Sequence, residues 1–434
     1  MRFRSTRGAA EEVDFSTALL RGLAPDGGLY VPTRWPTFSV HDFDGTSSLA
    51  AVGERLLAPF VAGDRLENKL DEVVREAFDF PAPRHEIKAV PAGCALSVLE
   101  LFHGPTAAFK DFGARFLAAS FERLRDPREP LLNILVATSG DTGGAVAAAF
   151  HRRAGMAVTV LFPKGLVSPT QQRQLTCWGE NVRSFAVRGT FDDCQRMVKQ
   201  AFVDDSLRSR QQLSSANSIN LGRLLPQAVY YAATSLAFHR EHGGSLSFII
   251  PSGNLGNAAA CLWARHMGLP IGEVILAHNA NRTVLDFLNE GQWRPRPSVA
   301  TLASAMDVGN PSNMERLRDL FPDLESLRGA IFAQSVDDAA IAARIRSDKT
   351  GLGEIWCPHT AVAAEVWHTL PPSRRLAQAW CIVSTAAAAK FPEIVEPLIG
   401  EKVPVPHSLA ALLDRPSRFE EIGASLEDLR AALA

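Results

Sequence analysis

The stretch "LLNILVATSGDTGGAVAAAFHRRAG", residues 131–155, contains the pattern that decides the fold. Its first half is an almost continuous apolar run that ends in small and hydroxyl-bearing residues, which is typical of a buried strand followed by a turn. Its second half has the composition of a helix. The sequence therefore predicts a strand, a tight turn and a helix in direct succession.

The same alternation continues towards the C-terminus. Further strands are expected at 156–165, 181–189, 246–253, 273–280 and the start of 378–391, and further helices at 168–180, 190–202 and 254–268. Ser168 and Pro169 suit the N-cap and the first turn of one of these helices. Strands that alternate with helices indicate an α/β fold with mainly parallel sheets, in which ligands bind at the carboxyl ends of strands.

The bulk composition is that of a globular protein of two or three domains. The chain has 434 residues, of which 46% are hydrophobic and 21% charged. The net charge of −2 gives no general attraction to nucleic acid or to an anionic membrane. The charged N-terminus lacks the apolar stretch of a signal peptide, and the 6 cysteines form no CxxC pair. We therefore expect a cytoplasmic protein with reduced thiols, no metal site, and no membrane or nucleic-acid partner.

The turn "ATSGDTGGA", residues 137–145, places hydroxyl groups and glycines at one strand end. Thr138, Ser139 and Thr142 can donate hydrogen bonds, and Gly140 lets the backbone approach a ligand closely. The positive dipole end of the following helix would favour a carboxylate or a phosphate at this turn. The turn taken alone is also compatible with an ordinary capped helix.

A second turn, "PSGNLGNAA" at residues 251–259, repeats this arrangement. Gly253, Asn254 and Gly256 lie between a strand and a helix, as in a phosphate cradle built from backbone amides. The spacing is neither GxGxxG nor that of a Walker loop, so dinucleotides and triphosphates are not indicated.

Two further polar clusters occur later in the chain. "SANSINLGR", residues 215–223, ends in Arg223, which could hold a phosphate or a carboxylate with two hydrogen bonds. "CIVSTAAAAKF", residues 381–391, places Ser384 and Thr385 before a run of small residues. Each cluster is equally compatible with a capped helix start.

Lys110 lies in "HGPTAAFKDFGARF", residues 103–116, a segment otherwise suited to a protein core. Either Lys110 is a surface lysine with a buried stem, or its amine lies in a pocket where desolvation lowers its pKa enough to form a Schiff base. Two anion cradles, this lysine and a strand-end hydroxyl together indicate an α/β enzyme with a phosphorylated cofactor bound through Lys110.

The full set of motifs resembles the threonine synthases, and their long form most closely. The opening segments "STRG" and "LLRGLAPDGGLYVP", the lysine motif "ELFHGPTAAFKDFGARF" and the loop "ATSGDTGGAVA" match that form. "SANSIN", "PSGNLGN", "AMDVGNPSNMERL", "PHTAVA" and, imperfectly, "STAAAAKF" follow in the expected order. These enzymes belong to the tryptophan-synthase-β-like group, which uses pyridoxal phosphate.

The resemblance implies the type II pyridoxal-phosphate architecture, with two parallel-sheet α/β domains and an extra N-terminal region. We expect the N-terminal region at 1–95, a large cofactor-binding domain at 96–130 and 218–434, and a small α/β substrate domain at 131–217. The active site would lie between the two domains of a monomer or homodimer.

The resemblance also implies roles for the residues of the strand ends. Lys110 would form the internal aldimine with pyridoxal 5'-phosphate and then act as the catalytic base. The other cofactor-binding residues would be Asp141 near the ring hydroxyl, Gly253, Asn254, Leu255 and Gly256 at the phosphate, and Thr385 or its neighbour Ser384 at the pyridine nitrogen. The substrate-binding residues would be Thr138, Ser139, Gly140 and Thr142 at the carboxylate, and Ser218, Asn220 and Arg223 on the phosphate side.

The implied reaction converts O-phospho-L-homoserine and water into L-threonine and phosphate. Several positions depart from the family pattern: Ala387 and Ala388 replace His-Pro, Leu255 replaces Phe, Asn257 and Arg282 replace Asp, and Cys357 replaces an acidic residue. These departures leave two alternatives open. One is a pyridoxal-phosphate lyase or dehydratase acting on another hydroxy or phospho amino acid, and the other is a non-catalytic protein that binds the cofactor or a ligand.

Overall fold

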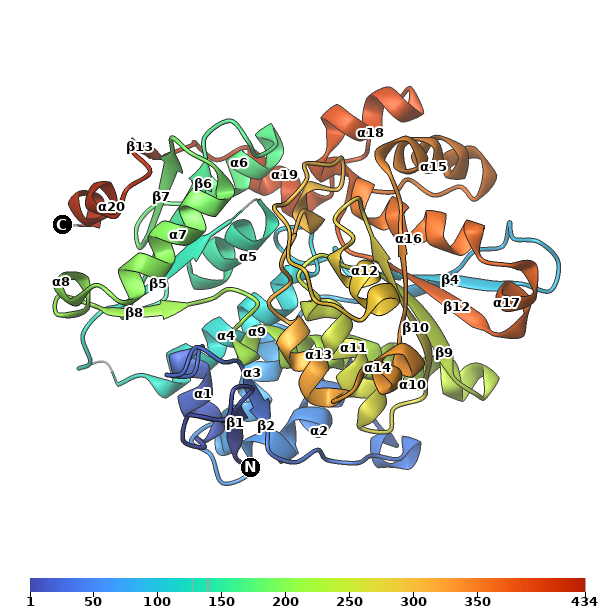
Figure 1. The fold of residues 1–434 in the computed structure, drawn as a ribbon, viewed down its shortest axis with the longest axis horizontal. Coiled ribbons are helices and arrows are strands. Elements are labelled where there is room, and N and C mark those ends of the chain that lie inside the picture. Colours follow the sequence, from blue (N-terminus) through green and yellow to red (C-terminus); the bar gives the residue numbers. More distant parts are fainter. Residues whose placement is uncertain (127, 139, 434) are drawn as a thin grey trace.

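The computed structural model describes residues 1–126, 128–138 and 140–433, and its framework is two mainly parallel sheets (Figure 1). The larger sheet has the strand order β11-β10-β9-β12-β4-β3. Its strands are β3 (Arg84–Glu86), β4 (Ala95–Glu100), β9 (Leu246–Pro251), β10 (Ile271–His278), β11 (Phe332–Ser335) and β12 (Ala379–Ser384). Neighbouring strands are parallel except β3, which runs antiparallel to β4.

The smaller sheet is entirely parallel and has the order β13-β7-β6-β5-β8. Its strands are β5 (Leu132–Ala137), β6 (Met156–Pro163), β7 (Val182–Val187), β8 (Gln212–Ser215) and β13 (Glu420–Ile422). A separate antiparallel pair, β1 (Phe3–Ser5) and β2 (Tyr30–Pro32), lies in the N-terminal region.

The helices cover both sheets and confirm the predicted alternation. Their bounds are α1 (Phe15–Arg21), α2 (Leu49–Val61), α3 (Leu70–Ala77), α4 (Lys110–Leu124), α5 (Asp141–Phe150), α6 (Pro169–Thr176), α7 (Phe191–Phe202), α8 (Asp205–Arg208), α9 (Leu221–Leu224), α10 (Ala228–His242), α11 (Gly256–His266), α12 (Thr283–Glu290), α13 (Met314–Leu320), α14 (Leu324–Ala330), α15 (Asp338–Gly351), α16 (Pro358–Thr369), α17 (Pro372–Ala377), α18 (Pro392–Ile399), α19 (His407–Leu413) and α20 (Leu426–Leu433). Ser168 caps α6 as expected, because its hydroxyl accepts a hydrogen bond from the Gln171 N–H at 3.1 Å.

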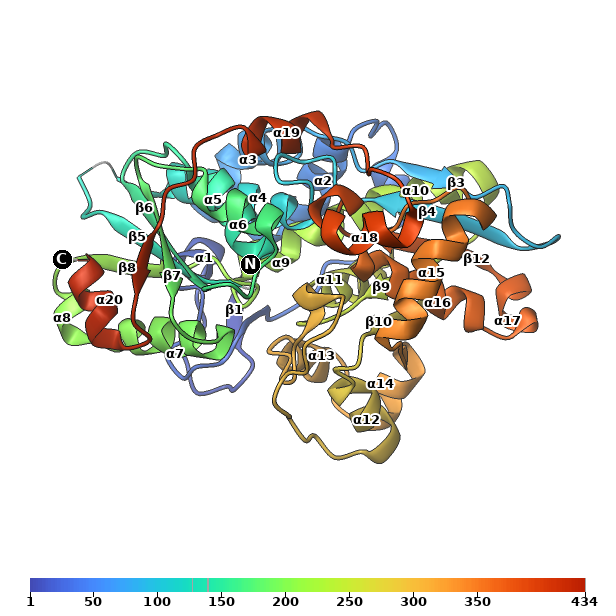
Figure 2. The ribbon, with the colours of Figure 1, turned by 90° about the horizontal axis from the view of Figure 1, so that it is seen from above.

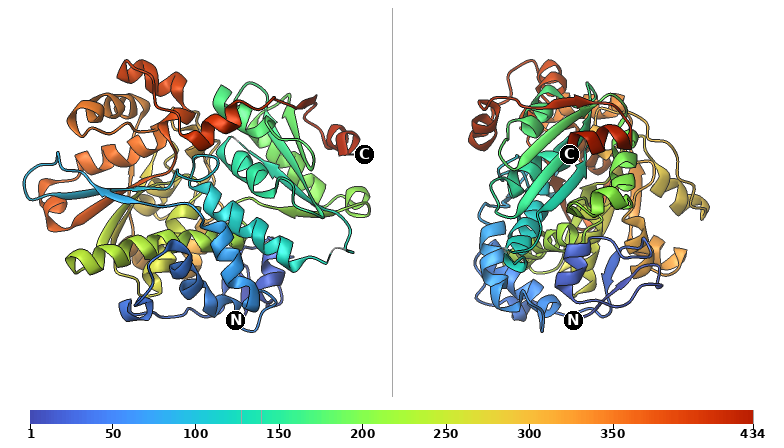
Figure 3. Two further views of the ribbon diagram at one scale, coloured as in Figure 1. Left: turned by 180° about the vertical axis from the view of Figure 1, so that it is seen from behind. Right: turned by 90° about the vertical axis from the view of Figure 1, so that its left-hand side faces the viewer.

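Helices lie on both faces of each sheet. Figure 2 shows α5 and α6 on one face of the smaller sheet and α7 on the other. In the larger sheet, α10 and α11 pack on one side of β9 and β10, and α16 packs on the other. The N-terminal region lies beneath both, with α2 against α10 and α3 against α4 (Figure 3).

Two strands lie outside the domain ranges expected for them. The range 218–434 placed the whole C-terminal part with the larger sheet, but β13 pairs with β7 of the smaller sheet and α20 packs on α7. Similarly, β3 falls within the predicted N-terminal region 1–95 yet pairs with β4. Both are short edge strands. The partner of β13 is distant in sequence, and the pairing of β3 is set by tertiary packing, so the local sequence pattern carries little information about either strand.

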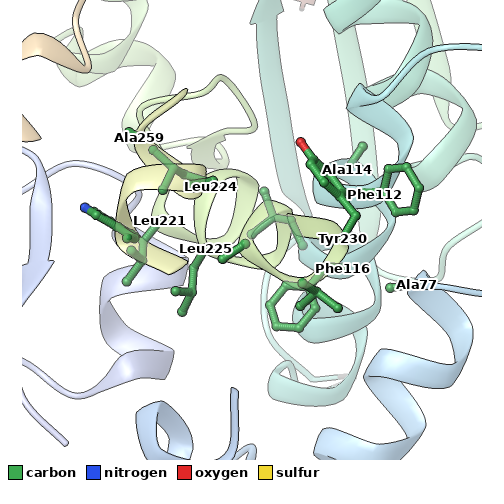
Figure 4. Close-up of a cluster of buried hydrophobic side chains, with 14 of the residues drawn as sticks. Ala77, Phe112, Ala114, Phe116, Leu221, Leu224, Leu225, Tyr230 and Ala259 are labelled. Atoms are coloured by element: carbon green, nitrogen blue, oxygen red, sulfur yellow. The ribbon is translucent and has the colours of Figure 1, made fainter. Parts of the chain in front are cut away.

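Helix α4 carries Lys110 and is fixed by its apolar side. Figure 4 shows Phe112 and Phe116 of α4 beside Tyr230 of α10 in a cluster of buried hydrophobic side chains. The rings of Phe112 and Tyr230 meet edge to face at 5.1 Å. A Cβ atom added at Gly113 would lie 2.3 Å from the Arg223 carbonyl oxygen, so α4 and α9 touch backbone to backbone. This contact sets the position of Lys110 relative to Arg223.

Within the described ranges, the structure has neither a membrane-spanning helix nor a cluster of metal-ligating side chains. None of the helices there is long and apolar enough to cross a membrane. Over the same residues, no group of three or more histidine, cysteine or carboxylate side chains is placed to hold a metal ion. All six cysteines are free thiols.

Candidate active site

Lys110 is the first residue of α4, and the segment before it is tied to the end of β12. The Phe109 N–H donates to the Thr385 carbonyl at 2.9 Å, and the Ala387 N–H donates to the Ala107 carbonyl at 3.1 Å. Ala107 has a positive φ of 54°, an uncommon conformation for a residue with a side chain. These bonds place Lys110 beside the polar end of β12, as the sequence predicted for a site at the strand ends.

The amine of Lys110 has an environment that weakens its hold on a proton. Burial lowers its pKa to about 8, and although Asp141 acts in the opposite direction, the positive charges of Arg223 and Lys390 add to the lowering. Lys110 is half-buried, and the charged groups around its amine favour the pocket interpretation over a surface lysine. An amine with a pKa near neutrality is suited to form a covalent bond and to transfer protons.

Asp141 and Lys390 form a buried ion pair at the start of α5. The Lys390 ammonium lies 2.9 Å from Asp141 Oδ1 and donates to the Thr106 carbonyl at 2.8 Å. The Gln171 amide donates to the same Asp141 oxygen at 3.1 Å. Burial alone would raise the pKa of Asp141, but the charges of Lys390 and Lys110 outweigh it and hold that pKa well below its usual range.

The loop before α5 is shaped by its own hydroxyl group. Thr138 Oγ1 accepts from the N–H groups of Gly140 at 3.0 Å and Gly143 at 2.9 Å, and it donates to the Gly140 carbonyl at 3.1 Å. This uses the full capacity of a hydroxyl, so the predicted contact of Thr138 with the substrate does not fit. Ser139 lies outside the described residues. Thr142 is partly exposed at the first turn of α5 and remains a candidate.

Gly140 could not be replaced by a residue with a side chain without strain. Its φ is 139°, and an added Cβ atom would lie 2.5 Å from the Gln171 side chain. Because Gln171 also holds Asp141, the glycine lets the loop and α6 pack directly against each other.

The loop at 253–256 ends in the N-terminus of α11, and its glycines fit the predicted cradle. The first N–H groups of a helix have no acceptor within the helix and can bind an anion. Leu255 adopts a left-handed conformation with φ 62°, which turns the chain into α11. A Cβ atom at Gly253 would lie 2.8 Å from the Met306 backbone, and one at Gly256 meets only ordinary contacts.

Hydrogen bonds of Asn254 hold this loop against two neighbouring segments. Its amide donates to the Ser218 hydroxyl at 2.6 Å, and its Oδ1 accepts from the Ser312 N–H at 2.6 Å. Its carbonyl accepts from the Asn313 amide at 3.0 Å. Asn254 and Ser218 therefore lie together, and the Asn254 side chain holds the loop in place.

Asn220 does not face the site. It is completely buried, donates to the carbonyls of Leu19 at 2.9 Å and Ser215 at 3.2 Å, and accepts from the Gly222 N–H at 2.9 Å. These bonds cap α9 and tie it to α1 in the N-terminal region. The prediction that Asn220 contacts the substrate is therefore wrong, because both of its amide hydrogens are already used.

Arg223 is buried and only partly paired. It donates to the Ala216 carbonyl, while its Nε has no hydrogen-bond partner among the described residues. Burial lowers its pKa to about 10, and Asp111 acts in the opposite direction. A buried guanidinium with unused donors is suited to an anionic ligand.

The end of β12 distinguishes the two candidate hydroxyl groups. Ser384 Oγ lies 3.3 Å from the Thr360 hydroxyl, which also accepts from the Thr385 N–H at 3.3 Å. Within the described part of the chain, the Thr385 hydroxyl makes no hydrogen bond. This geometry favours Thr385 over Ser384 as the partner of a bound ligand.

The departures from the family pattern have local physical explanations. Asn257 accepts hydrogen bonds from the hydroxyls of Tyr230 and Tyr231, while its Nδ2 has no hydrogen-bond partner among the described residues. Cys357 caps α16 through its sulfur, 3.4 Å from the Thr360 nitrogen. Arg282 is half-exposed and binds Asp286 at 2.9 Å. At the buried position of Cys357, a neutral group avoids the cost of burying a carboxylate.

Lys390 and His359 also belong to the site, although they were not predicted from the sequence. His359 is buried, accepts from the Ala305 N–H at 3.0 Å, and interacts with Asp141, Lys110 and Lys390; burial lowers its pKa to about 4. Lys390 repeats the signal that pointed to Lys110, a lone lysine after a run of small residues at a strand end.

The residues present fit pyridoxal phosphate. Lys110 supplies an amine of lowered pKa, the N-terminus of α11 supplies N–H groups that have no acceptor within the helix and suit a phosphate, and Thr385 supplies a hydroxyl for a ring nitrogen. Arg223, with its unpartnered Nε, supplies a second place for an anion.

Comparison with known proteins gives a consistent result over the whole chain. Residues 80–384 match the family of pyridoxal-phosphate dependent enzymes, residues 2–78 the threonine synthase N terminus, and residues 360–433 the threonine synthase C-terminal family. The threonine synthase of Serratia marcescens is 38% identical over 98% of this chain and 96% of its own length.

Two solved structures are similar over nearly their full length. The crystal structure of threonine synthase from Escherichia coli has a TM-score of 0.90 and 37% identity, covering 100% of this chain and 99% of that one. The structure of threonine synthase from Brucella melitensis with bound pyridoxal phosphate has a TM-score of 0.89 and 34% identity, covering 100% and 98%.

Proposed function

Because the chain belongs to the threonine synthase family, we propose that the strand-end site around Lys110 carries out that family's reaction. The chain is a pyridoxal-phosphate-dependent lyase that converts O-phospho-L-homoserine and water into L-threonine and phosphate. The relatives favour neither a changed substrate nor a protein without activity. What remains to be assigned is the role of each residue.

The cofactor-binding roles follow from the fit described above. Lys110 would hold the cofactor through its amine, the N–H groups at 253–256 would bind its phosphate, and Thr385 would bond its pyridine nitrogen. Bound there, pyridoxal phosphate withdraws electrons from the substrate α carbon, which makes neighbouring protons acidic. Asp141 would accept a hydrogen bond near the ring hydroxyl.

Lys110 would move the protons of the reaction. Once the substrate amine displaces it, the free amine can take the proton from the substrate α carbon. A second proton leaves the β carbon, phosphate leaves the γ carbon, the γ carbon is protonated, water adds its hydroxyl at the β carbon, and a proton returns to the α carbon. A base whose pKa is about 8 can take up and return protons near neutral pH.

Two regions would hold the substrate's anionic ends. The N-terminus of α5, with Gly140 and Thr142, suits the carboxylate because its N–H groups and dipole attract an anion. Arg223, with Ser218 nearby in the preceding segment, suits the phosphate because a guanidinium can donate two parallel hydrogen bonds.

We also propose a domain division, a cellular compartment and an oligomeric state for the protein. We divide the chain into an N-terminal region, a cofactor domain built on the larger sheet and a substrate domain built on the smaller one, with β13 and α20 joining the latter. The six free cysteines support a reducing compartment such as the cytoplasm. We propose a monomer or homodimer that acts without nucleic acid.

The observation that carries these assignments is Lys110, with a pKa lowered to about 8, among Asp141, Arg223 and Lys390. The test is to supply purified holoprotein with O-phospho-L-homoserine and follow phosphate and threonine together. Equal amounts of both products are expected. Phosphate without threonine would indicate a different lyase reaction, and cofactor absorbance without either product would indicate a binding protein.

A further inference from the structure

Lys390 is a fully buried lysine to which the proposed reaction assigns no role. It is the last residue of the short 3-10 helix η5 (Ala388–Lys390), which follows β12. Its ammonium has two acceptors, Asp141 Oδ1 at 2.9 Å and the Thr106 carbonyl at 2.8 Å. Buried charges persist in proteins when they are both paired and hydrogen-bonded, and Lys390 meets both conditions.

The carboxylate of Asp141 is held on one side. Lys390 and the Gln171 amide both contact Oδ1, at 2.9 and 3.1 Å. A carboxylate has acceptor sites on both oxygens, so Oδ2 keeps its capacity for a ligand. The ion pair therefore fixes the orientation of the Asp141 carboxylate and leaves Oδ2 able to accept a hydrogen bond from a ligand.

The contacts of Lys390 also join the two sheets at the site. Asp141 begins α5, which covers the smaller sheet, whereas Thr106 lies in the segment that leads to Lys110. The Thr106 N–H and hydroxyl both donate to Asp111, at 2.8 and 2.7 Å. Ser168, the cap of α6, donates to the Lys390 carbonyl at 3.4 Å. Lys390 thus links the Asp141 loop to the lysine segment.

We propose that Lys390 is a positioning residue of the reaction, which orients the Asp141 carboxylate towards the cofactor ring hydroxyl and couples it to the segment that carries Lys110. The inference rests on the proposed function. Lys390 acts through Asp141, because its side chain is buried and its ammonium contacts Asp141 and Thr106 instead of reaching the open site.

The charge of Lys390 should affect the protonation of the cofactor linkage at Lys110. The charged and titratable groups facing Lys110 are Asp141 of α5, Arg223 of α9, Lys390 of η5 and His359 of α16. Nearby cations favour loss of the proton and nearby anions oppose it. Removing the Lys390 charge should therefore raise the pH at which this proton is lost, and removing the Asp141 charge should lower it.

The test follows the visible absorbance of the holoprotein against pH, without substrate. Lys390→Met should move the midpoint upward by roughly one pH unit, the size expected for a unit charge nearby, and Asp141→Asn should move it downward. Lys390→Arg restores the charge and should return the midpoint towards the wild-type value. Lys402→Met is the matched control, because Lys402 pairs with Glu396 at 2.7 Å on the surface and should change nothing.

Each outcome decides the proposal. An unchanged midpoint in folded Lys390→Met, or no recovery in Lys390→Arg, would overturn it. If Lys390→Met does not fold, Asp141→Asn decides alone, since an unchanged midpoint there is equally contradictory. Failure of the wild-type protein to release phosphate would reject the proposed function, whereas the midpoints are measured without substrate and test Lys390 separately.

Discussion

The loops at 138–142 after β5 and 252–256 after β9 look alike in sequence but are held in different ways. The first closes on itself through the Thr138 hydroxyl and places one carboxylate, Asp141, against Lys390. The second is braced from behind by Asn254 and leaves the N-terminus of α11 open. Glycines and hydroxyl groups at a strand end therefore indicate a ligand-binding site. The surrounding charges and hydrogen bonds decide which ligand each loop binds.

The largest effect is expected from placing a charge in the open loop. Gly253→Asp would bring a carboxylate to the cofactor phosphate and force a Cβ atom within 2.8 Å of the Met306 backbone. Overpacking costs about 1–3 kcal/mol before repulsion is added, so cofactor affinity should fall on the order of 100-fold. Equilibrium titration with pyridoxal phosphate measures this. Gly329→Asp is the control, since apart from its own helix no atom lies within 4 Å of the added Cβ there.

Arg223→Ala should affect substrate instead of cofactor. A hydrogen bond to a charged group contributes about 1.5–3 kcal/mol, so kcat/KM on O-phospho-L-homoserine should fall roughly 10- to 100-fold. Arg208→Ala, on the surface, should leave it unchanged. Loss of cofactor from Arg223→Ala with normal substrate use would reverse the assignment of the two anion sites.

The fold and the centre of the site were predictable from the sequence because they depend on local patterns. Apolar runs followed by glycine-containing turns located β5, β9 and their helices, and the lysine motif located Lys110. The Lys390–Asp141 pair and the burial of Asn220 depend on contacts between segments far apart in the chain. The strand β13 was missed for the same reason, since its partner β7 is distant in sequence.

A third test compares two glycines of the closed loop and its helix. In Gly140→Ala, the alanine would have to adopt a φ of 139°, and its Cβ atom would lie 2.5 Å from the Gln171 side chain. Such strain costs about 1–3 kcal/mol. Substrate use should fall about 10-fold and the Tm should drop, with cofactor affinity less affected. Gly144→Ala is the matched control, because its nearest neighbour would be an ordinary contact at 3.5 Å. Equal losses in both variants would contradict the account.

The smallest effect concerns a departure from the family pattern. Ala388 begins η5, and the preceding Ala387 is extended with φ −65° and ψ 138°, as a residue before proline should be. Ala388→Pro should therefore raise the free energy of unfolding by about 0.4–1 kcal/mol, because proline lowers the conformational entropy of the unfolded chain. Denaturant titration measures it. A destabilised variant would mean that the Ala388 N–H or the space around it is needed.

The most direct test asks which of the two lysines at the site, Lys110 or Lys390, binds the cofactor. Holoprotein is reduced with borohydride, digested, and the peptide carrying the cofactor remnant is identified by mass spectrometry. The modification is expected on Lys110, with Lys390 unmodified. A remnant on Lys390, on another lysine or on none would contradict the assignment of Lys110 as the residue that binds the cofactor.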